Sequence, residues 1–406
     1  MPKSLNNSEL ITAKEAAKIL DVKLATIYSY AARGWLTSVR SGQGRARLYS
    51  SEDVQRLKAR HDARAGHGPV AAGALRWGEP VLETTICEIR PNGVYYRGKN
   101  AVELAQAGHT FEDVADFLWG ESLTSGKRWP SPPDTVEVRN ESPGESTHPI
   151  HRMIRQLVSH LDTRSAEGSF RESRDRVWRC VRALSFAHPT GPRGSNGIAG
   201  ELLRGWGHRE TEAGVRSINA ALILCAEHDL NASTLVARTV AGAGGTLDSV
   251  LLAGLAALSG SRHGGVCDAV EDWLTTLNSE DDARWAVINR LRDGGTILGF
   301  GHPLYPEGDP RARALLDFAD EISGERRELA LGRVIEREVR ERTGLEPTLD
   351  WGLVMLSASL GLPKHAPISL FASGRLAGWV AHAREQAAAG FLLRPRSRYI
   401  SLCGDD

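Results

Sequence analysis

Four positions in the second half of the chain carry side chains that could move protons or bind anions. His228 follows the apolar run ALILCAE, and His263 precedes a Gly-Gly pair in SRHGGVCDAV. His302 lies in the irregular segment ILGFGHPLYPEGDPRARAL, and Asp350 begins the apolar segment DWGLVMLSASLGLP. Imidazole and carboxylate groups are the usual general acids and bases of enzymes. These residue types therefore permit acid–base chemistry at each position.

Each position also has a purely structural interpretation. A histidine at a helix end commonly caps the helix or belongs to the core, and Asp350 alone is most simply an N-cap. Arg262 and His263 could cap a helix end, with Gly264-Gly265 as the turn. A Gly-Gly pair weakens a helix, so it serves a turn or leaves room for a close approach.

Arg311 is harder to explain by local structure. Asp309 and Pro310 are typical of a helix start, which places Arg311 in the first turn of a helix. A cation there opposes the helix dipole and gains most if it meets an anion. Arg311 is therefore a candidate anion-binding residue.

Composition indicates a globular, cytoplasmic protein of two or three domains. The chain has 406 residues, of which 41% are hydrophobic and 25% charged. Its apolar runs are too short to span a bilayer, and MPKSLNNSEL lacks a signal core. No H-E-x-x-H, C-x-x-C or acidic cluster has metal-ligand spacing, so we expect no metal. Five scattered cysteines are predicted to be reduced thiols: Cys87, Cys180, Cys225, Cys267 and Cys403.

The first 65 residues predict a helix-turn-helix module with a basic wing. In LITAKEAAKILDV, Thr12 and Glu15 form a capping box at a helix start. KLATIYSYAARG reads as a second helix with Leu24, Ile27 and Tyr28 facing inward, LTSVRSGQGRARLYS as a hairpin wing and SSEDVQRLKAR as a third helix. This order resembles the MerR-like and excisionase-like winged DNA-binding domains.

Charge supports an anion-binding role for residues 1–65. They hold five Lys and seven Arg against six Asp plus Glu, a net of +6, whereas the whole chain is formally neutral. The resemblance implies groove contacts and phosphate contacts from the second helix and the wing. The alternative is a helical adaptor with solvated charges, joined to the body by a Gly/Ala/Pro-rich linker at 66–76. The candidate DNA-binding residues are Thr26, Ser29, Tyr30, Arg40, Arg45 and Arg47.

The body of the chain is predicted to be mainly α-helical. VLETTICEIRPNGVYYRG alternates β-branched residues around an Asn92-Gly93 turn, which predicts a small hairpin. Helical periodicity then dominates to about residue 390, for example in AVELAQAGHTFEDVADFLWG and LDSVLLAGLAALSG. No regular β-α-β alternation appears, and the glycines of GAGG follow no strand, so a Rossmann fold is not indicated.

Ordered motifs in this body resemble the citrate synthase family. SRHGGVCDAV, GFGHPLYPEGDPRA and PTLDWGLVMLSASLGLP resemble its three active-site segments, and AEHDLNAST resembles its oxaloacetate-binding histidine segment. ASGRLAGWVAHAREQ and LLRPRSRY resemble its two C-terminal arginine segments, and ETTICEIRPNGVYYRG its entry hairpin. The resemblance implies a large domain (77–264 and 366–406), a small domain (265–365) and a cleft between them that closes on the substrate.

The resemblance also implies catalytic roles and substrates. Asp350 would remove a methyl proton from acetyl-CoA, His263 would donate a hydrogen bond to the thioester oxygen, and His302 would polarise the keto carbonyl of oxaloacetate. The glycines after His263 would let backbone and substrate approach closely. The acyl-CoA is a substrate, and no further cofactor is implied. The oxo-acid carboxylates would be held by His228, Arg311, Arg375 and Arg394, the last reaching from the other subunit of a homodimer.

Some residues depart from the family pattern. Pro303 follows His302, and Pro306 stands where many members have a basic residue that helps to hold CoA. Asp350 is followed by Trp-Gly-Leu where many members have an aromatic pair and Ser-Gly. These departures bear on CoA binding and on the choice of acyl group.

Three functions are compatible with the sequence. The first is a synthase that makes citrate, as in the tricarboxylic acid cycle, or a homologue such as 2-methylcitrate. The second is a DNA-binding transcription regulator whose synthase body senses metabolites, and the third is an inactive body retained for assembly. The complete set of Asp350, His263 and His302 favours the synthase.

Overall fold

The structure is a computed structural model that divides into two compact units. One unit contains Thr84–Arg394, and the other contains Met1–Glu83 with Pro395–Asp406. The residues that the structure describes are 10–20, 22–32, 36–40, 47–51, 53–55, 57–58, 82–126, 128–130, 148–159, 161, 170–185, 196–322 and 326–395.

The N-terminal unit pairs two short helices with a small antiparallel sheet. The predicted capping box is present, since the Thr12 amide donates to the Glu15 carboxylate (2.7 Å) and the Glu15 amide donates to Thr12 Oγ1 (3.3 Å). Residues 51, 53–55 and 57–58 are helical, where a third helix was predicted. The sheet has the order β1-β3-β2, and its first strand was not predicted. The elements are β1 (Leu10–Thr12), α1 (Ala13–Leu20), α2 (Leu24–Ala32), β2 (Ser38–Arg40) and β3 (Arg47–Ser50).

The core of this unit corrects one prediction about α2. Ile27 is fully buried, but Leu24 and Tyr28 are 37% and 52% exposed, so the inward orientation predicted for these two is wrong. The buried face follows helical spacing, because Tyr30 and Ala31, three and four residues after Ile27, are the ones that pack against the core.

A hairpin at the start of the body has the predicted strands with a shifted turn. Strands β4 (Cys87–Arg90), β5 (Gly93–Tyr96) and β6 (Lys99–Asn100) form one antiparallel sheet. Gly93 pairs with Arg90, so the central turn residues are Pro91 and Asn92, and the predicted Asn92-Gly93 turn is wrong by one residue. Gly93 adopts φ +134°, a conformation that other residues rarely adopt.

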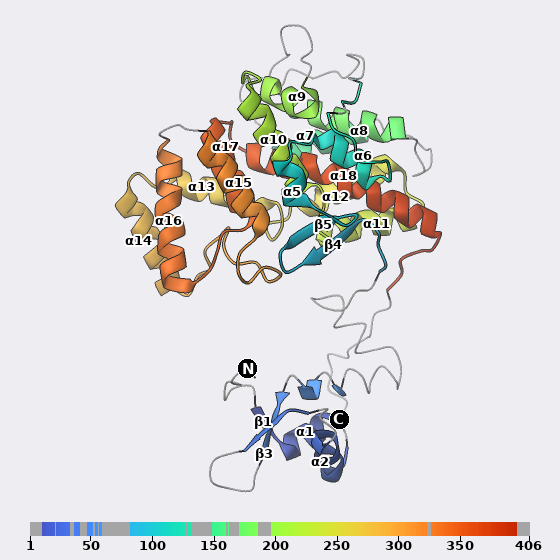
Figure 1. The fold of residues 1–406 in the computed structure, drawn as a ribbon, viewed down its shortest axis with the longest axis vertical. Helices are drawn as coiled ribbons and strands as arrows, with labels where there is room; N and C mark the ends of the chain where they lie inside the picture. Colours follow the sequence, from blue (N-terminus) through green and yellow to red (C-terminus); the bar gives the residue numbers. More distant parts are fainter. Residues whose placement is uncertain are drawn as a thin grey trace. The chain divides into compact units, whose positions relative to one another are not determined.

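The body beyond the hairpin is mainly α-helical, as predicted. The predicted helical stretch after β6 is broken by a capping box in which Thr110 Oγ1 accepts from the Asp113 amide, giving α5 (Ala101–Gln106) and α6 (Phe111–Leu118). The long helix α18 (Ala366–Ala389) runs through the middle of the remaining helices, and Ala366–Ala383 are all buried (Figure 1). Helix α18 packs against α7 (Pro149–Val158), α8 (Phe170–Arg182), α10 (Glu212–Cys225), α11 (Ala232–Gly242) and α12 (Leu247–Leu258). Helix α9 (Gly197–Gly205) packs against α8 and α10.

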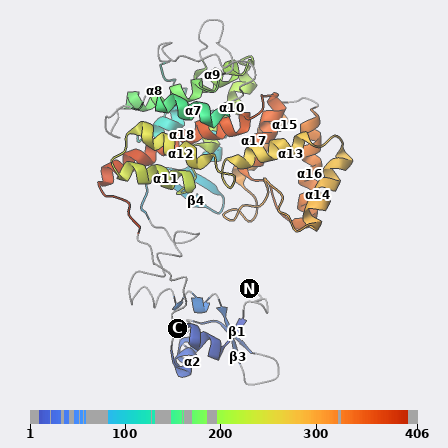
Figure 2. The same ribbon diagram turned by 180° about the vertical axis from the view of Figure 1, so that it is seen from behind.

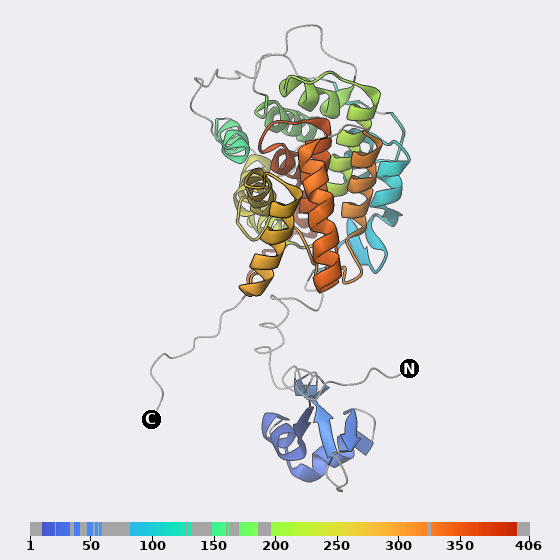
Figure 3. The same ribbon diagram turned by 90° about the vertical axis from the view of Figure 1, so that its left-hand side faces the viewer.

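A second hydrophobic core lies at one end of the body. Its buried side chains fall between Val270 and Met355 and come mainly from α13, α14, α16 and α17. Of these helices, α13, α14 and α16 lie together in both Figure 2 and Figure 3. The helices of this region are α13 (Gly265–Thr275), α14 (Glu280–Arg292), α15 (Pro310–Glu321), α16 (Arg327–Thr343) and α17 (Leu349–Leu360). The domain boundaries predicted from the sequence, at 264/265 and 365/366 in the body, stay predictions. Within the described residues, no helix has the length and apolar character needed to cross a membrane.

Candidate active site

Six of the predicted site residues lie close together in the body. They come from the turn after α10, the α12–α13 junction, the α14–α15 connection and the helices α15, α17 and α18. Four of these residues are close enough to His228 to shift its pKa. They are Arg311, Arg375, His302 and His263. Arg311 acts in turn on the pKa of Asp350. The six residues are His228, His263, His302, Arg311, Asp350 and Arg375.

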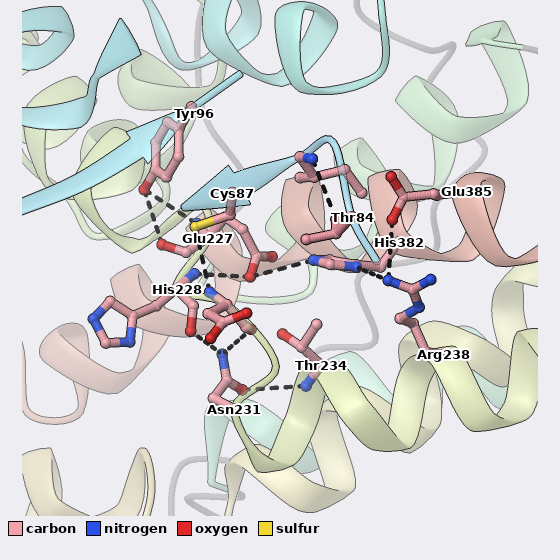
Figure 4. Close-up of polar contacts among 12 residues, drawn as sticks. Thr84, Cys87, Tyr96, Glu227, His228, Asn231, Thr234, Arg238, His382 and Glu385 are labelled. Carbon is pink, nitrogen blue, oxygen red and sulfur yellow. Dashed lines mark hydrogen bonds and ion pairs between the residues drawn. The ribbon is translucent and has the colours of Figure 1, made fainter. Parts of the chain in front are cut away.

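The turn that carries His228 is fixed by buried polar groups (Figure 4). The Tyr96 hydroxyl from β5 lies 2.9 Å from the Ile223 carbonyl and accepts from the Glu227 amide at 3.1 Å. The Glu227 carboxylate accepts from the His228 amide at 2.8 Å. Asn231 caps α11 and donates its side-chain amide to the His228 carbonyl at 3.3 Å. The backbone on both sides of His228 is therefore held in place.

The fully buried imidazole of His382 contacts the Glu227 carboxylate (Figure 4). Its Nδ1 lies 3.3 Å from Arg238 Nη1, and its Nε2 lies 3.5 Å from Glu227 Oε1. A guanidinium can only donate, so Nδ1 accepts and Nε2 carries the proton that faces Glu227. Arg238 also binds Glu385 at 3.0 Å, so the buried acids and bases form one connected network.

His228 and His302 meet at a shared tyrosine. His228 Nε2 lies 2.9 Å from the Tyr305 hydroxyl, and the rings of His228 and His302 meet edge to face at 5.4 Å. Burial, with Arg311 and Arg375, lowers the pKa of His228 well below its ordinary value. Burial and Arg311 lower the pKa of His302 as well. Both imidazoles are therefore neutral at pH 7 and act as hydrogen-bonding groups rather than as cations.

Arg311 is paired with the residue that caps its own helix. Its Nε and Nη2 donate to the two oxygens of Asp309 at 3.0 and 2.7 Å, and both residues are buried. Burial alone would lower the pKa of Arg311, but Asp309 outweighs it and the pKa is raised. The predicted start of α15 at Asp309 and Pro310 is confirmed. The ion pair with Asp309 compensates for the unfavourable interaction between the Arg311 cation and the dipole of α15.

Arg375 is a buried guanidinium with two unpaired nitrogens. It is 1% exposed, and among the residues that the structure describes its Nε and Nη1 have no hydrogen-bond partner. Its guanidinium lies 5.1 Å from the centre of the Phe371 ring, which gives a cation–π contact but supplies no negative charge. A buried cation with unmet donors is costly, and a bound carboxylate would supply both the charge and the acceptors.

Asp350 has the electrostatics of a general base. It is the second residue of α17, whose N-cap is Thr348, so the simple interpretation of Asp350 as an N-cap is wrong. Its Oδ1 accepts from the Cys267 thiol at 3.3 Å, and its Oδ2 accepts from the Thr348 hydroxyl at 3.4 Å. Burial raises the pKa of Asp350 to about 6, against the opposing effects of Cys267 and Arg311. The carboxylate is therefore more basic than an ordinary aspartate, yet still ionised at pH 7.

His263 is a neutral imidazole whose tautomer depends on Ser233. Burial and Arg375 lower the pKa of His263 to about 4. Ser233 Oγ donates to Asn231 Oδ1 at 2.7 Å and lies 2.8 Å from His263 Nε2. In this arrangement Ser233 accepts from Nε2, and it can donate to Nε2 only if its single proton turns away from Asn231. When Ser233 donates to His263, the imidazole proton lies on Nδ1, which is then free to donate to a substrate.

The glycines after His263 serve a close backbone approach. Gly264 has right-handed helical dihedral angles, φ −57° and ψ −25°, so it is not needed for a positive φ. A Cβ on Gly264 would lie 2.9 Å from the Leu258 carbonyl oxygen, and one on Gly265 would lie 3.0 Å from the Gly260 carbonyl oxygen. The pair lets the start of α13 lie against the end of α12, which places His263 beside the site.

Arg394 is not brought into this group. It is exposed, and within the described residues no hydrogen bond or ion pair joins it to the other predicted site residues. The preceding residues Phe391 and Leu393 lie against Gly242, at the end of α11. Its predicted place in the site of a partner subunit stays a prediction.

The predicted DNA-binding residues are only partly described. Thr26, Ser29 and Tyr30 on α2 are half-buried, and Arg47 on β3 is exposed. For Arg40 only the backbone in β2 is described, and Arg45 lies outside the described residues. Their contacts with DNA stay predictions.

A group of metal-ligating side chains lies elsewhere in the described part of the body. The ligand atoms of His148, Asp268 and His365 all lie within 4.8 Å of one another. His148 Nδ1 accepts from the Ile150 amide at 3.3 Å, so Nε2 carries the proton and donates to Asp268 at 2.8 Å. A ligating histidine normally donates from its other nitrogen, which is the reverse arrangement. We interpret the group as a structural contact in which His148 and His365 both hydrogen-bond to Asp268. The expected lack of a metal site stays a prediction.

Several residues of the site were not found from the sequence. Tyr305 could have been suspected from its place three residues after His302, and Asp309 was assigned only to the helix start. Ser233 and Cys267 gave no signal, because their importance depends on contacts with His263 and Asp350 across 30 and 83 residues of sequence.

The chemistry that this site permits is well defined. Two buried guanidiniums and two neutral imidazoles suit an anionic substrate with a carbonyl group. A carboxylate of raised pKa beside them can take a proton from a weak acid, and a further neutral imidazole can donate to an oxygen on which charge develops.

Comparison with known proteins gives the same picture. The family model "Citrate synthase, C-terminal domain" matches residues 74–396, and the model "Helix-turn-helix domain" matches residues 10–62. Citrate synthase 2 of Bacillus subtilis is 29% identical over 356 residues, covering 80% of this chain and 95% of that protein. The putative citrate synthase 2 of Mycobacterium tuberculosis is 32% identical over 348 residues, covering 80% and 91%. The 2-methylcitrate synthase of Shewanella oneidensis is 28% identical, covering 80% and 92%.

Solved structures agree in fold. The citrate synthase of Thermotoga maritima superposes with a TM-score of 0.67 at 27% identity, covering 81% of this chain and 96% of that one. The citrate synthase of Thermoplasma acidophilum gives a TM-score of 0.69 at 20% identity, covering 84% and 98%, which is a likeness of fold. With its ordered motifs, helical body and matching family model, this chain belongs to the citrate synthase family and carries an N-terminal helix-turn-helix domain.

Proposed function

We propose that this protein condenses a short acyl-CoA, acetyl-CoA in the first instance, with oxaloacetate and releases citrate, or a homologue of citrate, and CoA. The observation that carries the proposal is the partly buried carboxyl of Asp350, whose raised pKa is influenced by the buried Arg311, in a group of residues that also contains the buried Arg375. Asp350 supplies a base for a weak carbon acid, and the arginines supply charge partners for a dicarboxylate.

Binding of the oxo acid uses the cationic part of the site. Arg375 offers two donors that lack acceptors, and Arg311 offers the nitrogen that Asp309 leaves open. His228, neutral and held by its rigid turn, adds a directional donor. His302 then polarises the keto carbonyl, because a neutral imidazole can donate a hydrogen bond and later give up its proton.

The reaction begins at the methyl carbon of the acyl-CoA. Asp350 takes a proton from that carbon, and the electron pair moves to the thioester oxygen, where His263 stabilises it by donating a hydrogen bond. The enolate carbon attacks the keto carbon, and the new alkoxide receives a proton from the His302 imidazole. Water then cleaves the thioester, which gives the free carboxylate and CoA.

The acyl group is the open part of the proposal. The relatives include proteins named citrate synthase and 2-methylcitrate synthase, which differ in this group. The Thermoplasma acidophilum protein was solved as a ternary complex with carboxymethyl coenzyme A and oxaloacetate. Pro303 and Pro306 are both exposed, and we propose that these departures from the family pattern affect which acyl group is accepted.

A thiol-release assay tests the proposal. Acetyl-, propionyl- and butyryl-CoA are each offered with oxaloacetate, 2-oxoglutarate and pyruvate, and free CoA is measured. We expect release with oxaloacetate and at least one of the acyl-CoAs. No release with any pair, from a protein that is folded by circular dichroism, would contradict the proposal.

We also propose a homodimer. Arg394 is exposed and lies outside the group formed by the other site residues, which suits a side chain that completes the site of a second subunit. Measurement of mass by light scattering at several protein concentrations tests this directly, and a monomer at all concentrations would contradict it.

A cytoplasmic location is expected as well. Cys87, Cys180, Cys225 and Cys267 are free and buried, as in proteins kept in a reducing compartment. Fractionation of the source cells with a compartment marker tests this expectation.

A second candidate function is DNA binding. The observation that favours it is the helix-turn-helix family match over residues 10–62, together with the +6 charge of residues 1–65. Selection from random duplexes at about 0.15 M salt tests it. An enriched sequence whose binding responds to oxaloacetate or acyl-CoA would support a regulator. If no sequence is enriched and binding does not depend on salt, the module is an adaptor.

A further inference from the structure

The Cys267 thiol lies directly against the Asp350 carboxyl. Cys267 is the third residue of α13 and is fully buried in the main core of the body. Its Sγ lies 3.3 Å from Asp350 Oδ1, within the range of a sulfur hydrogen bond. This contact joins the start of α13 to the start of α17.

The thiol must be the donor in this contact. Burial, reinforced by the nearby Asp350, raises the pKa of the Cys267 thiol well above its ordinary value, so the group stays protonated. An ionised carboxylate can only accept. The arrangement is therefore S–H donating to Oδ1, with the Thr348 hydroxyl donating to Oδ2 at 3.4 Å.

Both side-chain donors to Asp350 are weak, which suits a base. A thiol is a poor hydrogen-bond donor, and 3.4 Å is long for a hydroxyl. Strong donors would stabilise the carboxylate and lower its affinity for a proton. Weak donors hold the orientation of the carboxylate and leave much of its basicity intact.

We propose that Cys267 is a positioning residue for the general base: its thiol orients the Asp350 carboxylate and limits how basic it becomes. This inference rests on the proposed function of Asp350. Cys267 itself touches the base and has no assigned contact with substrate.

The other charged and titratable groups around Asp350 define what a change at Cys267 can do. Arg311 on α15 favours the ionised carboxylate, whereas Asp309 at the start of that helix opposes it. Cys225 at the end of α10 is also coupled to Asp350, but burial raises the pKa of that thiol to about 12, so it stays neutral. Replacing Cys267 leaves these groups in place, so its own contribution can be measured.

Two substitutions should move the pH profile in opposite directions. Cys267→Ala removes a donor that favours the ionised carboxylate, so the pKa of Asp350 rises and the acid limb of kcat/KM moves to higher pH. Cys267→Ser supplies a stronger donor, so the limb moves to lower pH. One hydrogen bond corresponds to a shift of about half a pH unit.

Matched controls come from another buried cysteine. Cys180 on α8 is fully buried in the same core, and no contact between it and Asp350 is found in the described structure. Cys180→Ala and Cys180→Ser carry the same changes in volume and polarity, so their acid limbs should stay where the wild type has its limb. Unchanged limbs in both Cys267 variants, or shifts of the same sign, would overturn the inference.

An infrared measurement tests the hydrogen bond without using activity. The S–H stretching band of Cys267 is identified as the band that Cys267→Ala removes from the full-length protein. We expect this band to move to higher frequency in Asp350→Ala, because the thiol loses its acceptor. A band that does not move would overturn the inference. If the band moves but the wild-type protein releases no CoA, the proposed function is contradicted and the hydrogen bond is confirmed.

Discussion

In the proposed mechanism, Asp350 is a partly buried carboxyl that must carry a charge to act as the base. Its surroundings raise its pKa to about 6, while burial and Arg375 lower the pKa of His263 to about 4. The base is ionised and the neighbouring imidazole is neutral over the same range of pH. Proton abstraction and hydrogen-bond donation can therefore occur in one site without a change of pH.

This balance predicts the acid side of the pH profile. Asp350 accepts a proton only when ionised, so kcat/KM for the acyl-CoA should rise with pH and level off above about pH 6. Initial rates from about pH 5 to about pH 8, in buffers of constant ionic strength, check this. A limb near pH 4, typical of an exposed aspartate, would show that burial does not tune this group.

Arg375 should control affinity for the oxo acid. Arg375→Gln leaves a substrate carboxylate without its charged partner, so the KM for oxaloacetate should rise about tenfold or more. The KM for acyl-CoA should change much less. Arg384→Gln, the same substitution on the same helix, is the control and should leave both constants near their wild-type values. If both variants behave alike, the carboxylate site is misplaced.

The sequence could identify these residues only where they lie in motifs. The histidines, Arg311, Arg375 and Asp350 were found in this way. Ser233 and Cys267 lie in two of these motifs, AEHDLNAST and SRHGGVCDAV, but were given no role. No motif shows that a serine on α11 meets His263 or that a thiol on α13 meets Asp350. Tertiary contact assigns those roles.

At the scale of elements, the turn after α10 depends on its contact with α18. The Gly378 amide donates to the Ala226 carbonyl at 3.1 Å, and a Cβ at Gly378 would overlap Ala226 O and Glu227 Oε2. Helix α18 therefore touches the segment that places His228. A change in the middle of a long buried helix can thus alter substrate binding.

Gly378→Ala should lower both stability and oxo-acid affinity. The extra methyl group has no space, and overpacking costs about 1–3 kcal/mol. The melting temperature should fall, and the KM for oxaloacetate should rise because His228 moves. Gly242→Ala is a milder control, since its Cβ would lie no closer than 3.3 Å to any neighbour. Equal losses in the two variants would argue against a specific contact between α18 and the His228 turn.

Elements were more predictable than their registers. The Thr12–Glu15 capping box and the Asp309-Pro310 helix start were visible in the sequence because they are local. The turn of the hairpin was misplaced by one residue, because strand pairing, not the Asn-Gly dipeptide, sets which residues lie opposite each other. Strand β1 was missed because its partner β3 lies more than 30 residues away.

At the scale of the whole molecule, the account requires two chains for one complete site. Asp350→Ala and Arg394→Ala can be co-expressed with different tags, and the heterodimer purified through both. If Arg394 reaches across, the heterodimer keeps one intact site, with Asp350 from one chain and Arg394 from the other. It should then show about half of the wild-type turnover, while each homodimer stays low.

The same heterodimer can also contradict a site shared between two chains. A heterodimer as inactive as its parent homodimers would place Arg394 in the site of its own chain. An Arg394→Ala homodimer with wild-type turnover would place Arg394 outside any site. A variant that lacks residues 1–65 is a further control. The body carries the site residues, so this variant should keep its turnover.

The most direct test of the central claim is the replacement of Asp350 by Asn, which keeps the shape of the side chain and removes the base. Free CoA release and oxaloacetate binding by calorimetry are measured on the same preparation. The account predicts that turnover falls by about 10²–10⁴-fold while oxaloacetate affinity stays within a few-fold of the wild type. Near wild-type release of CoA by Asp350→Asn would contradict the account.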